Sequence, residues 1–477
     1  MAEYEAVIGL EIHVQLSTNT KMFCGCRLEF GAEPNTLTCP VCLGHPGTLP
    51  VPNEKAVRYA IAIGLALGCD IAETCMFHRK NYFYPDLPKG YQISQFDVPI
   101  CADGELAGVR IHRAHMEEDA AKNIHVGESG RIHGAGRTIV DYNRGGTPLV
   151  EIVTEPDIHS GAQAREWLQL LRATIKQLGV SDVNMEEGSL RCDANISIRP
   201  VGDTELGVKT ELKNMNSFRF IERGIDAEIA RQTALLNAGE KVVQETLHFD
   251  PSSGSLTSLR SKEESHDYRY FPEPDLVTLA PSKELIEEIR AELPELPLQK
   301  AGRYEGEYGL AEDTARFLAF NADLGGYFES VLAAAGDGAD AKRIADWVTG
   351  ELVARLGADA NPAESNVSPD ALARLVALVG EKKVTNNGAK TVLDKLVESG
   401  GDPDAIVEAE GLAAMGDSEE LGGVIDDALA ANPKAVEELK GGKDKAIGAI
   451  IGFVMKQTQG RADGGEVTRI VREKLGL

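Results

Sequence analysis

The chain has 477 residues, enough for roughly two to four domains, and it holds no apolar run long enough to span a bilayer. Its first residues lack the basic flank and apolar stretch of a signal peptide, and its eight cysteines suit a reducing compartment, so we expect a cytoplasmic protein. The net charge of −26 argues against nucleic-acid binding by the whole surface, but it leaves room for a local basic patch.

Up to about residue 290, the sequence predicts strands with helices between them. Residues 7–16 alternate with a period of two, which places Glu11, His13 and Gln15 on one face of a strand. Further strands are predicted at residues 149–155, 189–198 and 208–213. Helices are predicted at residues 53–68, 161–178 and 217–236.

Four cysteines follow the first strand within nineteen residues: Cys24, Cys26, Cys39 and Cys42. Twelve residues separate the two pairs, so a loop can fold back and bring four thiolates into the tetrahedron that zinc favours. A glycine inside the first pair and a Pro-Val turn inside the second favour a metal. Two free thiol pairs or a redox dithiol are the alternative. We predict a structural zinc site.

Beyond a proline-rich joint at residues 293–297, the pattern is that of helices alone. Ser368 and Pro369 supply an N-cap and a first-turn proline for one of these helices. Residues 401–430 carry nine acidic side chains and no lysine or arginine, and we expect this acidic stretch to be a mobile joint. Residues 431–477 carry nine basic and six acidic side chains, a net charge of +3. The change of sign indicates a small helical module with a different partner.

The polar faces of the predicted strands carry candidate chemistry in the form of acids, a histidine and cations: Glu11, His13, Glu151, Arg191, Asp193, Lys209, Glu211 and Lys213. Residues 115–119 add four ionisable side chains. A solvated sheet face is the simpler interpretation for any one strand, but four such segments favour a site. Oxygen ligands with one imidazole suit Mg²⁺ or Mn²⁺, and lysine and arginine suit phosphate.

The usual nucleotide-binding signatures are missing from the sequence. It contains no GxxxxGK[ST] and no GxGxxG between a strand and a helix, which argues against a P-loop NTPase and a Rossmann dehydrogenase. A G-x-S-x-G elbow and the kinase signature set are also missing.

Eight segments in collinear order resemble the B-type subunit of the tRNA-dependent amidotransferases. They are GLEIHVQL (9–16), RKNYFYPD (79–86), YQISQFD (91–97), HMEEDA (115–120), GTPLVEIVTEPD (146–157), GSLRCDAN (188–195), ELKNMNS (211–217) and HDYRYFPEPD (266–275). That family includes a longer archaeal E type with an inserted synthetase-like domain, which this chain lacks. The B type is therefore the better match.

The resemblance implies a cradle-shaped α/β (α+β) domain with a largely antiparallel sheet, then an all-α helical domain and a small helical tail domain. We place these domains at residues 1–293, 294–402 and 403–477. Some members of the family carry the zinc cysteines, and this sequence has all four.

The resemblance also implies an activity. It is an ATP-dependent carbon–nitrogen ligase with glutamine as amido donor, which converts Glu-tRNA(Gln) to Gln-tRNA(Gln) or Asp-tRNA(Asn) to Asn-tRNA(Asn). The side-chain carboxylate is phosphorylated and then amidated with ammonia. The chain shows no catalytic Ser-Lys signature of an amidase, so we expect ammonia from a separate A-type subunit, a glutaminase of the amidase kind, with a small C-type subunit completing a heterotrimer.

The resemblance assigns roles to individual residues. Glu11, His13, Glu118 and Glu151 would hold Mg²⁺ as the catalytic group. Six residues would bind ATP or phosphate: Lys80, Lys89, Arg191, Asp193, Lys209 and Lys213. Lys80 and Lys89 could instead guide ammonia. The basic tail would bind tRNA through Lys440, Lys443, Lys445, Lys456 and Arg461.

Two alternatives remain open. A non-catalytic scaffold that presents tRNA to a partner enzyme would need no dense acidic site, and ATP hydrolysis stimulated by misacylated tRNA would exclude it. A stand-alone zinc-containing ATP-dependent ligase would act on a small acid without tRNA or partners. Whether Glu-tRNA(Gln), Asp-tRNA(Asn) or both are substrates depends on the tRNAs and synthetases of the cell.

Overall fold

The computed structural model describes residues 3–127, 135–261, 268–357, 360–415, 419–458 and 460–477. The chain forms two compact units, Met1–Pro297 and Leu298–Leu477. Among the described residues, no helix is both long and apolar enough to cross a membrane.

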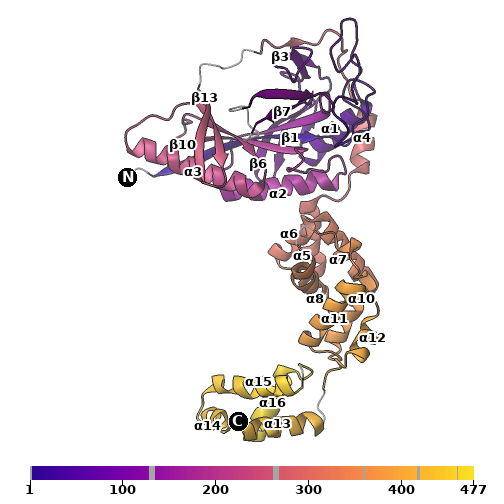
Figure 1. The fold of residues 1–477 in the computed structure, drawn as a ribbon, viewed down its shortest axis with the longest axis vertical. Helices are drawn as coiled ribbons and strands as arrows, with labels where there is room; N and C mark the ends of the chain where they lie inside the picture. Colours follow the sequence, from indigo (N-terminus) through magenta and orange to yellow (C-terminus); the bar gives the residue numbers. More distant parts are fainter. Residues whose placement is uncertain (1–2, 128–134, 262–267, 358–359, 416–418, 459) are drawn as a thin grey trace. The chain divides into compact units, whose positions relative to one another are not determined.

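A nine-stranded sheet is the centre of the first unit (Figure 1). Its strands, from one edge to the other, are β13 (Ser255–Ser261), β12 (Glu245–Asp250), β11 (Thr210–Met215), β10 (Leu190–Pro200), β1 (Tyr4–Gln15), β9 (Pro148–Thr154), β6 (Val109–Glu118), β5 (Cys101–Leu106) and β2 (Asp70–Ile71). Of the described pairings in this sheet, only β11 with β12 is parallel. The predicted α/β fold with a largely antiparallel sheet is confirmed.

Two smaller sheets belong to the same unit. The three-stranded sheet contains β14 (Phe271–Pro272), β3 (His78–Asn81) and β4 (Tyr91–Ser94), and the two-stranded sheet contains β7 (Lys122–Val126) and β8 (Arg137–Asp141). The three-stranded sheet joins chain segments almost two hundred residues apart, since Phe271 pairs with Arg79.

The first unit contains α1 (Glu54–Ala66), α2 (Gly161–Gln177), α3 (Phe218–Asn237) and α4 (Lys283–Glu292). The first three confirm the predicted helices. Each begins at a polar N-cap, because the side chains of Asn53, Ser160 and Ser217 accept a hydrogen bond from the first helical turn. Figure 1 shows α2 and α3 along one face of the sheet. They come so close together that a Cβ on Gly161 would lie 2.5 Å from the Glu222 carbonyl oxygen.

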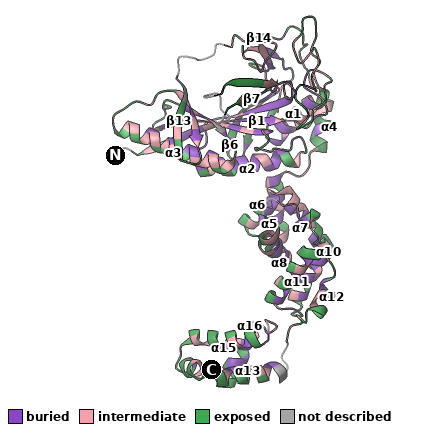
Figure 2. Ribbon diagram, viewed as in Figure 1, coloured by how far each residue is buried: buried purple, intermediate pink, exposed green. Residues whose placement is uncertain are grey.

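The strands are amphipathic, and this separates a packed face from a polar face. In β10, Leu190, Cys192, Ala194, Ile196 and Ile198 are all buried, as the alternation predicts. In β1 the even-numbered residues from Ile8 to Val14 are buried, and Glu11 and His13 lie on the other face. Figure 2 shows the central strands largely buried. The helices cover the apolar face, which leaves the polar face for a site.

Strand β6 contains a β-bulge that reverses its alternation. Val109 and Ile111 are buried before the irregularity between Ile111 and Arg113, and Ala114 and Met116 are buried after it. A bulge places one extra residue in a strand, so the side chains beyond it change face. His115 and Glu117 are thereby brought to the polar face.

All described elements of the second unit are helices. They are α5 (Pro297–Tyr308), α6 (Glu312–Ala319), α7 (Ala322–Ala335), α8 (Ala341–Asp346), the π-helix η2 (Trp347–Leu352), α9 (Val353–Leu356), η3 (Pro362–Glu364), α10 (Pro369–Gly380), α11 (Asn386–Ser399), α12 (Pro403–Ala409), α13 (Glu419–Ala431), α14 (Pro433–Lys440), η4 (Asp444–Ala446), α15 (Ile447–Gln457) and α16 (Gly464–Leu475). Helix α10 has the predicted start, since the Ser368 hydroxyl accepts a hydrogen bond from the Ala371 N–H at 3.2 Å.

The described residues of this unit form two hydrophobic cores. The first gathers buried residues from Ala301 to Leu396, and the second gathers buried residues from Leu421 to Val471. Ile406 of α12 packs against the first core. The predicted boundaries at 293 and 402 stay predictions, and the packing of α12 favours a second boundary nearer residue 415.

The expectation of a mobile acidic joint at residues 401–430 is wrong for α12 and α13, which both pack against a core. Residues 416–418 of the stretch lie outside the described residues. Leu421, Ile425 and Ala428 of α13 are fully buried in the second core. Its acidic residues alternate with apolar ones at helical spacing, so the stretch includes an amphipathic helix.

Candidate functional site

A cavity of about 810 Å³ opens on the polar face of the nine-stranded sheet. Its walls come from β1, β6, β9, β10 and β11, with aromatic side chains from the segments near β3 and β14. The charged residues that line it are Glu11, His13, Lys80, Arg113, His115, Glu117, Asp119, Glu151, Arg191, Lys209, Glu211, Lys213 and Glu245.

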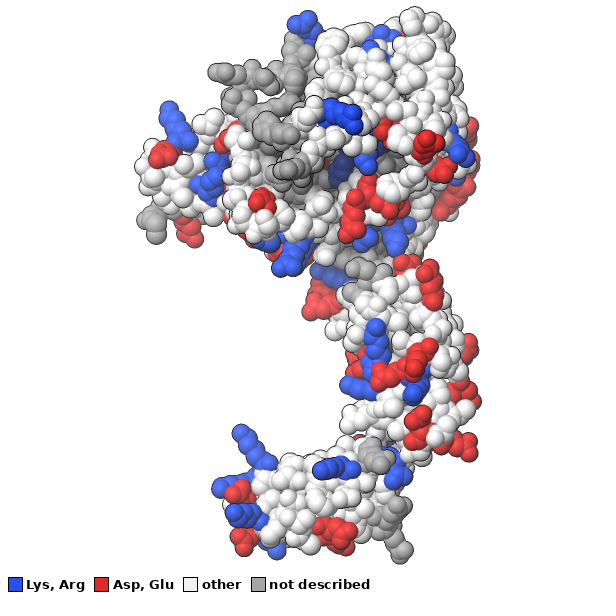
Figure 3. Space-filling model, viewed as in Figure 1, with Lys and Arg blue, Asp and Glu red and all other residues white. Residues whose placement is uncertain are grey.

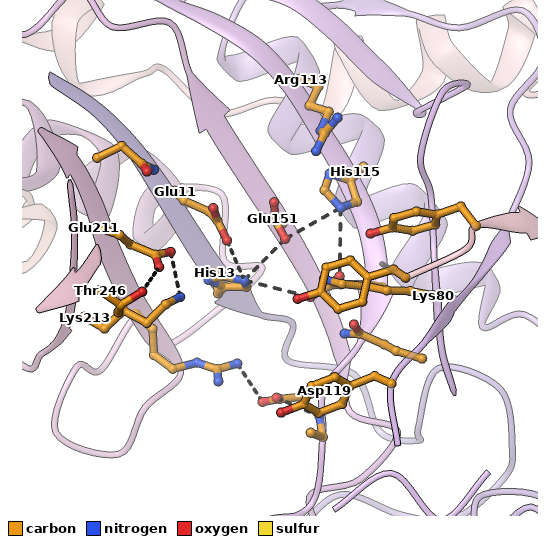
Figure 4. Close-up of a pocket in the computed structure, with 18 of the residues that line it drawn as sticks. Glu11, His13, Lys80, Arg113, His115, Asp119, Glu151, Glu211, Lys213 and Thr246 are labelled. Carbon is orange, nitrogen blue, oxygen red and sulfur yellow. Dashed lines mark hydrogen bonds and ion pairs between the residues drawn. The ribbon is translucent and has the colours of Figure 1, made fainter. Parts of the chain in front are cut away.

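Three adjacent strands place a carboxylate between two imidazoles at the centre of this cavity (Figure 4). Glu151 of β9 lies directly opposite His13 of β1 on one side and His115 of β6 on the other. The Glu151 Oε2 atom is 3.4 Å from His13 Nε2 and 3.8 Å from His115 Nε2. The register of the sheet therefore brings Glu151, His13 and His115 together.

Glu11 and Glu117 add two carboxylates to this centre. His13 Nε2 lies 3.8 Å from Glu11 Oε1 and 3.9 Å from Glu117 Oε1. Two overlapping triads have ligand atoms within 4.8 Å of one another: Glu11, His13 and Glu151, and His115, Glu117 and Glu151. This donor set is rich in oxygen and fits Mg²⁺, and its imidazoles also suit Mn²⁺.

The shifted pKa values of Glu11 and Glu117 reflect the close approach of several carboxylates in this centre. Burial and the Glu151 carboxylate raise the pKa of Glu11 to about 7. Burial, followed by the charge of Glu151, also raises the pKa of Glu117. Burial would likewise raise the pKa of Glu151, but His115 and His13 hold it well below its usual range. A cation bound here would relieve this repulsion.

The two histidines differ in their protonation. Burial would lower the pKa of His13, but its hydrogen bond with Glu151 raises it above the ordinary value. Burial lowers the pKa of His115 to about 4, so this imidazole is neutral near pH 7 and able to bind a metal.

Glu118 does not join this group, which corrects the predicted ligand set. Its carboxylate forms an ion pair with Lys89 and accepts a hydrogen bond from the Ile93 N–H at 3.0 Å. Both side chains line a separate cavity of about 90 Å³ beside Cys24 and Cys42. Glu118 is adjacent to Glu117 in β6 and therefore points to the opposite side of the sheet.

Of the residues predicted to bind ATP or phosphate, Lys80, Arg191, Lys209 and Lys213 line the large cavity, whereas Lys89 lines the smaller one. Asp193 lies opposite Glu11 in the register and pairs with Lys213 at 2.7 Å. Lys213 also pairs with Glu211 at 2.9 Å.

Arg191 is also paired within the protein. Its Nη2 donates to Asp119 at 2.8 Å. Burial would raise the pKa of Asp119, but Arg191 and Arg144 lower it.

The large cavity also presents cations without an ion pair among the described residues: Lys80, Arg113 and Lys209. The Lys80 amine lies 5.0 Å from the centre of the Tyr268 ring. Burial would lower its pKa, but the Glu117 and Glu151 carboxylates raise it. The Nε of Arg113 is buried without a hydrogen-bond partner in this part of the chain. These cations are available to a bound anion.

In the sequence, His115 and Glu117 lie in an ionisable segment that is not by itself assigned to the site, and Arg113 does not stand out. A period-two reading of residues 113–117 would have placed these three residues on one face. The first two residues of the motif at 266–275 lie outside the described residues, and Tyr268 and Tyr270 of that motif line the cavity.

The four cysteines of the predicted zinc site converge. Their sulfur atoms all lie within 4.8 Å of one another. A zinc tetrathiolate with bonds of about 2.3 Å has tetrahedral edges of about 3.8 Å, so a small contraction of the loop would complete it. The donor set fits zinc in both number and kind.

The predicted tRNA-binding residues lie at helix ends and loops of the tail. Lys440 and Lys456 lie in the last turns of α14 and α15, and Lys445 lies in η4. Lys443 and Arg461 lie in the connections. The four lysines are exposed, and Arg461 is half-buried. Figure 3 shows lysines and arginines on the visible surface of this module, with acidic side chains between them.

Comparison with known proteins places the chain in a family. The model of the GatB/GatE catalytic domain matches residues 6–287, and that of the GatB domain matches residues 326–475. A relative from Carboxydothermus hydrogenoformans is 48% identical over 100% of this chain and 99% of its own, and one from Syntrophotalea carbinolica is 50% identical over 99% of each. Both are named as the B-type subunit of aspartyl/glutamyl-tRNA(Asn/Gln) amidotransferase. The chain therefore belongs to the GatB family.

Proposed function

We propose that this chain is the transamidating component of a glutamine-dependent, tRNA-dependent amidotransferase. It binds Glu-tRNA(Gln) or Asp-tRNA(Asn), phosphorylates the side-chain carboxylate with ATP, and amidates the product. The observation that carries the proposal is the full-length likeness at 48–50% identity to proteins named as this component. The acid and imidazole centre of the large cavity agrees with it.

The residues present fit a magnesium site. Glu11, His13 and Glu151, with His115 and Glu117 beside them, would hold Mg²⁺. When bound, the ion would neutralise phosphate charge and polarise a phosphoryl oxygen. Because Mg²⁺ binds through a few protein ligands together with substrate phosphates, a surplus of carboxylates beside free cations suits an ATP site.

The cations of the cavity divide into two groups by their roles. Lys80, Arg113 and Lys209, without an ion pair in the described part, would bind the phosphates of ATP. Arg191 and Lys213 are paired with Asp119 and Asp193 and would keep those acids in place. Catalysis of phosphoryl transfer depends mainly on such positioning and charge neutralisation.

The reaction has two steps. In the first, a side-chain carboxylate oxygen of the aminoacyl group attacks the γ-phosphorus of ATP, ADP leaves, and an acyl phosphate forms. In the second, ammonia attacks the acyl carbon and phosphate leaves, which gives the amide. The first step is needed because a free carboxylate repels nucleophiles and offers only a poor leaving group.

Ammonia comes from glutamine hydrolysed by the A-type glutaminase, and the small C-type subunit completes the heterotrimer. Lys89 and Glu118 form a buried ion pair away from the acid centre. In this proposal that pair holds β4 against β6, since Glu118 also accepts a hydrogen bond from Ile93 of β4. Zinc at the four cysteines holds the loop that follows β1.

The tail contributes tRNA affinity through Lys440, Lys443, Lys445, Lys456 and Arg461. Phosphate contacts by lysine and arginine give affinity without base specificity, as a tRNA body requires. The choice between glutamate and aspartate substrates then lies in the tRNAs that the cell misacylates.

The proposal is tested in the reconstituted heterotrimer with misacylated tRNA, by measuring tRNA-dependent ATP hydrolysis and amide formation. Glu151→Gln should reduce both by at least about 100-fold, because it removes the carboxylate between the two imidazoles. Glu187→Gln, at an exposed acid outside the cavity, is the matched control. Full activity of Glu151→Gln would favour the tRNA-presenting scaffold instead.

A further inference from the structure

Lys21 is a buried lysine beside the four cysteines. It lies just after β1, and only 1% of its surface is exposed. Its backbone N–H donates to the Cys26 carbonyl at 2.9 Å. Its Nζ donates to the Tyr142 carbonyl at 3.0 Å and lies 3.7 Å from Cys42 Sγ. Lys21 therefore contacts both cysteine pairs, one through its backbone and the other through its side chain.

In the part of the chain that the structure describes, the amine of Lys21 has no carboxylate partner. Among the described residues, none of the ion pairs includes its amine, whereas the amines of Lys89 and Lys300, whose side chains are also largely buried, each face a glutamate. A buried ammonium is costly unless an anion balances it. Within the described part of the chain, the Cys42 thiol is the only acidic group that its amine contacts.

The backbone around Lys21 is shaped to hold its side chain. Gly146 adopts a φ of +86°, and a Cβ at that position would lie 3.3 Å from Lys21 Cδ and 3.8 Å from Cys42 Cβ. The Met22 N–H donates to the Gly146 carbonyl at 2.7 Å, which fixes this approach. The lysine stem thus runs through a slot between Gly146 and Cys42.

The sulfur of Cys42 also accepts a hydrogen bond from the backbone. The Cys39 N–H donates to Cys42 Sγ at 3.2 Å. A sulfur that accepts from a backbone amide and an ammonium is suited to remain a thiolate. Four thiolates around one Zn²⁺ leave a net charge of −2, and one neighbouring ammonium would halve it.

We propose that Lys21 is a charge-compensating positioning residue of the four-cysteine zinc site, and that it acts by donating to the Cys42 thiolate. The inference rests on the zinc site proposed above. Groups that contact metal ligands orient them and tune their donor strength, and their loss typically weakens metal binding by about 10–100-fold.

The test compares zinc and cobalt binding by the full chain with that of Lys21→Met and Lys21→Gln. Methionine keeps the stem and removes the charge, and glutamine removes the charge but keeps an N–H donor on a slightly shorter side chain. Lys300→Met is the matched control, because it removes another buried lysine far from the cysteines in the chain. Zinc affinity is measured by chelator competition. In the Co²⁺-loaded proteins, the energy of the thiolate-to-cobalt charge-transfer band is read from the absorption spectrum.

Both Lys21 variants should bind zinc about 10–100-fold more weakly, and their charge-transfer band should move, whereas Lys300→Met should match the wild type on both readouts. Wild-type affinity and an unmoved band in a folded Lys21 variant would overturn the role of Lys21. If Lys21→Met does not fold, Lys21→Gln decides. A wild-type chain that binds neither metal would instead overturn the zinc site itself, so the two failures are distinguishable.

Discussion

Glu117 and Glu118 are neighbouring acids in β6 that serve different environments. Glu117 faces the large cavity, where its carboxylate lies 3.9 Å from His13 and from His115. Glu118 faces the smaller cavity and balances the buried amine of Lys89. We therefore expect substitution of Glu117 to affect activity and substitution of Glu118 to affect stability, although the two side chains have the same chemistry.

Glu117→Gln should lower tRNA-dependent ATP turnover by at least tenfold and leave the unfolding transition close to that of the wild type. Glutamine keeps the volume of glutamate but removes a charge from the proposed magnesium centre. The measurement is ATP hydrolysis by the heterotrimer, together with urea denaturation of the isolated chain.

Glu118→Gln, the neighbouring control, should instead lower the free energy of unfolding by about 3–5 kcal/mol, because it leaves a buried ammonium without its counter-ion. The opposite result would be a Glu118→Gln variant that is stable but inactive and a Glu117→Gln variant that is active. It would indicate that Glu118, and not Glu117, is a ligand of the magnesium ion.

At the scale of elements, α3 supports the strands that form one wall of the cavity. Gly224 of α3 comes close to Met215 and Leu212 of β11, since a Cβ there would lie 3.2 Å and 3.5 Å from their side chains. The buried Glu228 of α3 accepts hydrogen bonds from Thr210 of β11 and from Gln232. The position of Glu211 and Lys213 in the cavity thus depends on this helix.

Ser217→Ala should destabilise the first unit by about 1 kcal/mol, because it removes the N-cap that accepts from the Phe220 N–H at 3.2 Å. Thr233→Ala in the same helix is the control. The Thr233 hydroxyl bonds back to the Ile229 carbonyl within the helix, and alanine is the better helix former, so this change should be neutral or slightly stabilising. Thermal unfolding of both variants checks the prediction. Equal losses of stability would show that the N-cap hydrogen bond makes no specific contribution.

At the scale of the whole molecule, most of the chain has a negative net charge, whereas its tail has a positive one. Arg374 and Asp404 form a two-bond ion pair at 2.6 Å and 2.8 Å that ties α12 to α10, which favours a tail that begins after α12. A truncation near residue 405 would cut into this packing. A truncation after Met415 would keep the first helical core intact.

A chain that ends at Met415 should bind misacylated tRNA more weakly, with a flatter salt dependence, and should still bind ATP. Each lysine or arginine contact to phosphate contributes about 0.7–0.9 to the salt slope, so the loss of five contacts would reduce it by about 4. The measurement is tRNA affinity at several salt concentrations for the truncated and full-length heterotrimers. Lys283→Gln, at an exposed lysine outside the tail, is the control. An unchanged slope would assign tRNA binding to other surfaces.

The sequence by itself determined the strand faces and most of the cavity's charged residues. Alternation with a period of two placed Glu11 with His13, and Lys209 with Glu211 and Lys213, because successive side chains in a strand point to opposite faces. The spacing of the four cysteines was likewise sufficient to predict their convergence. Both predictions rest on the spacing of residues that are close in the sequence, so they require no knowledge of contacts between distant segments.

Only the tertiary structure decided which acids of residues 115–119 face the cavity and which cation supports the cysteines. The bulge between Ile111 and Arg113 changes the face of every later side chain in β6, and no residue in the sequence marks it. The antiparallel register then brings Glu151 between His13 and His115. Lys21 meets Cys42 only because the loop folds back against Gly146. Register and loop closure depend on contacts between segments far apart in the chain, which a local pattern does not encode.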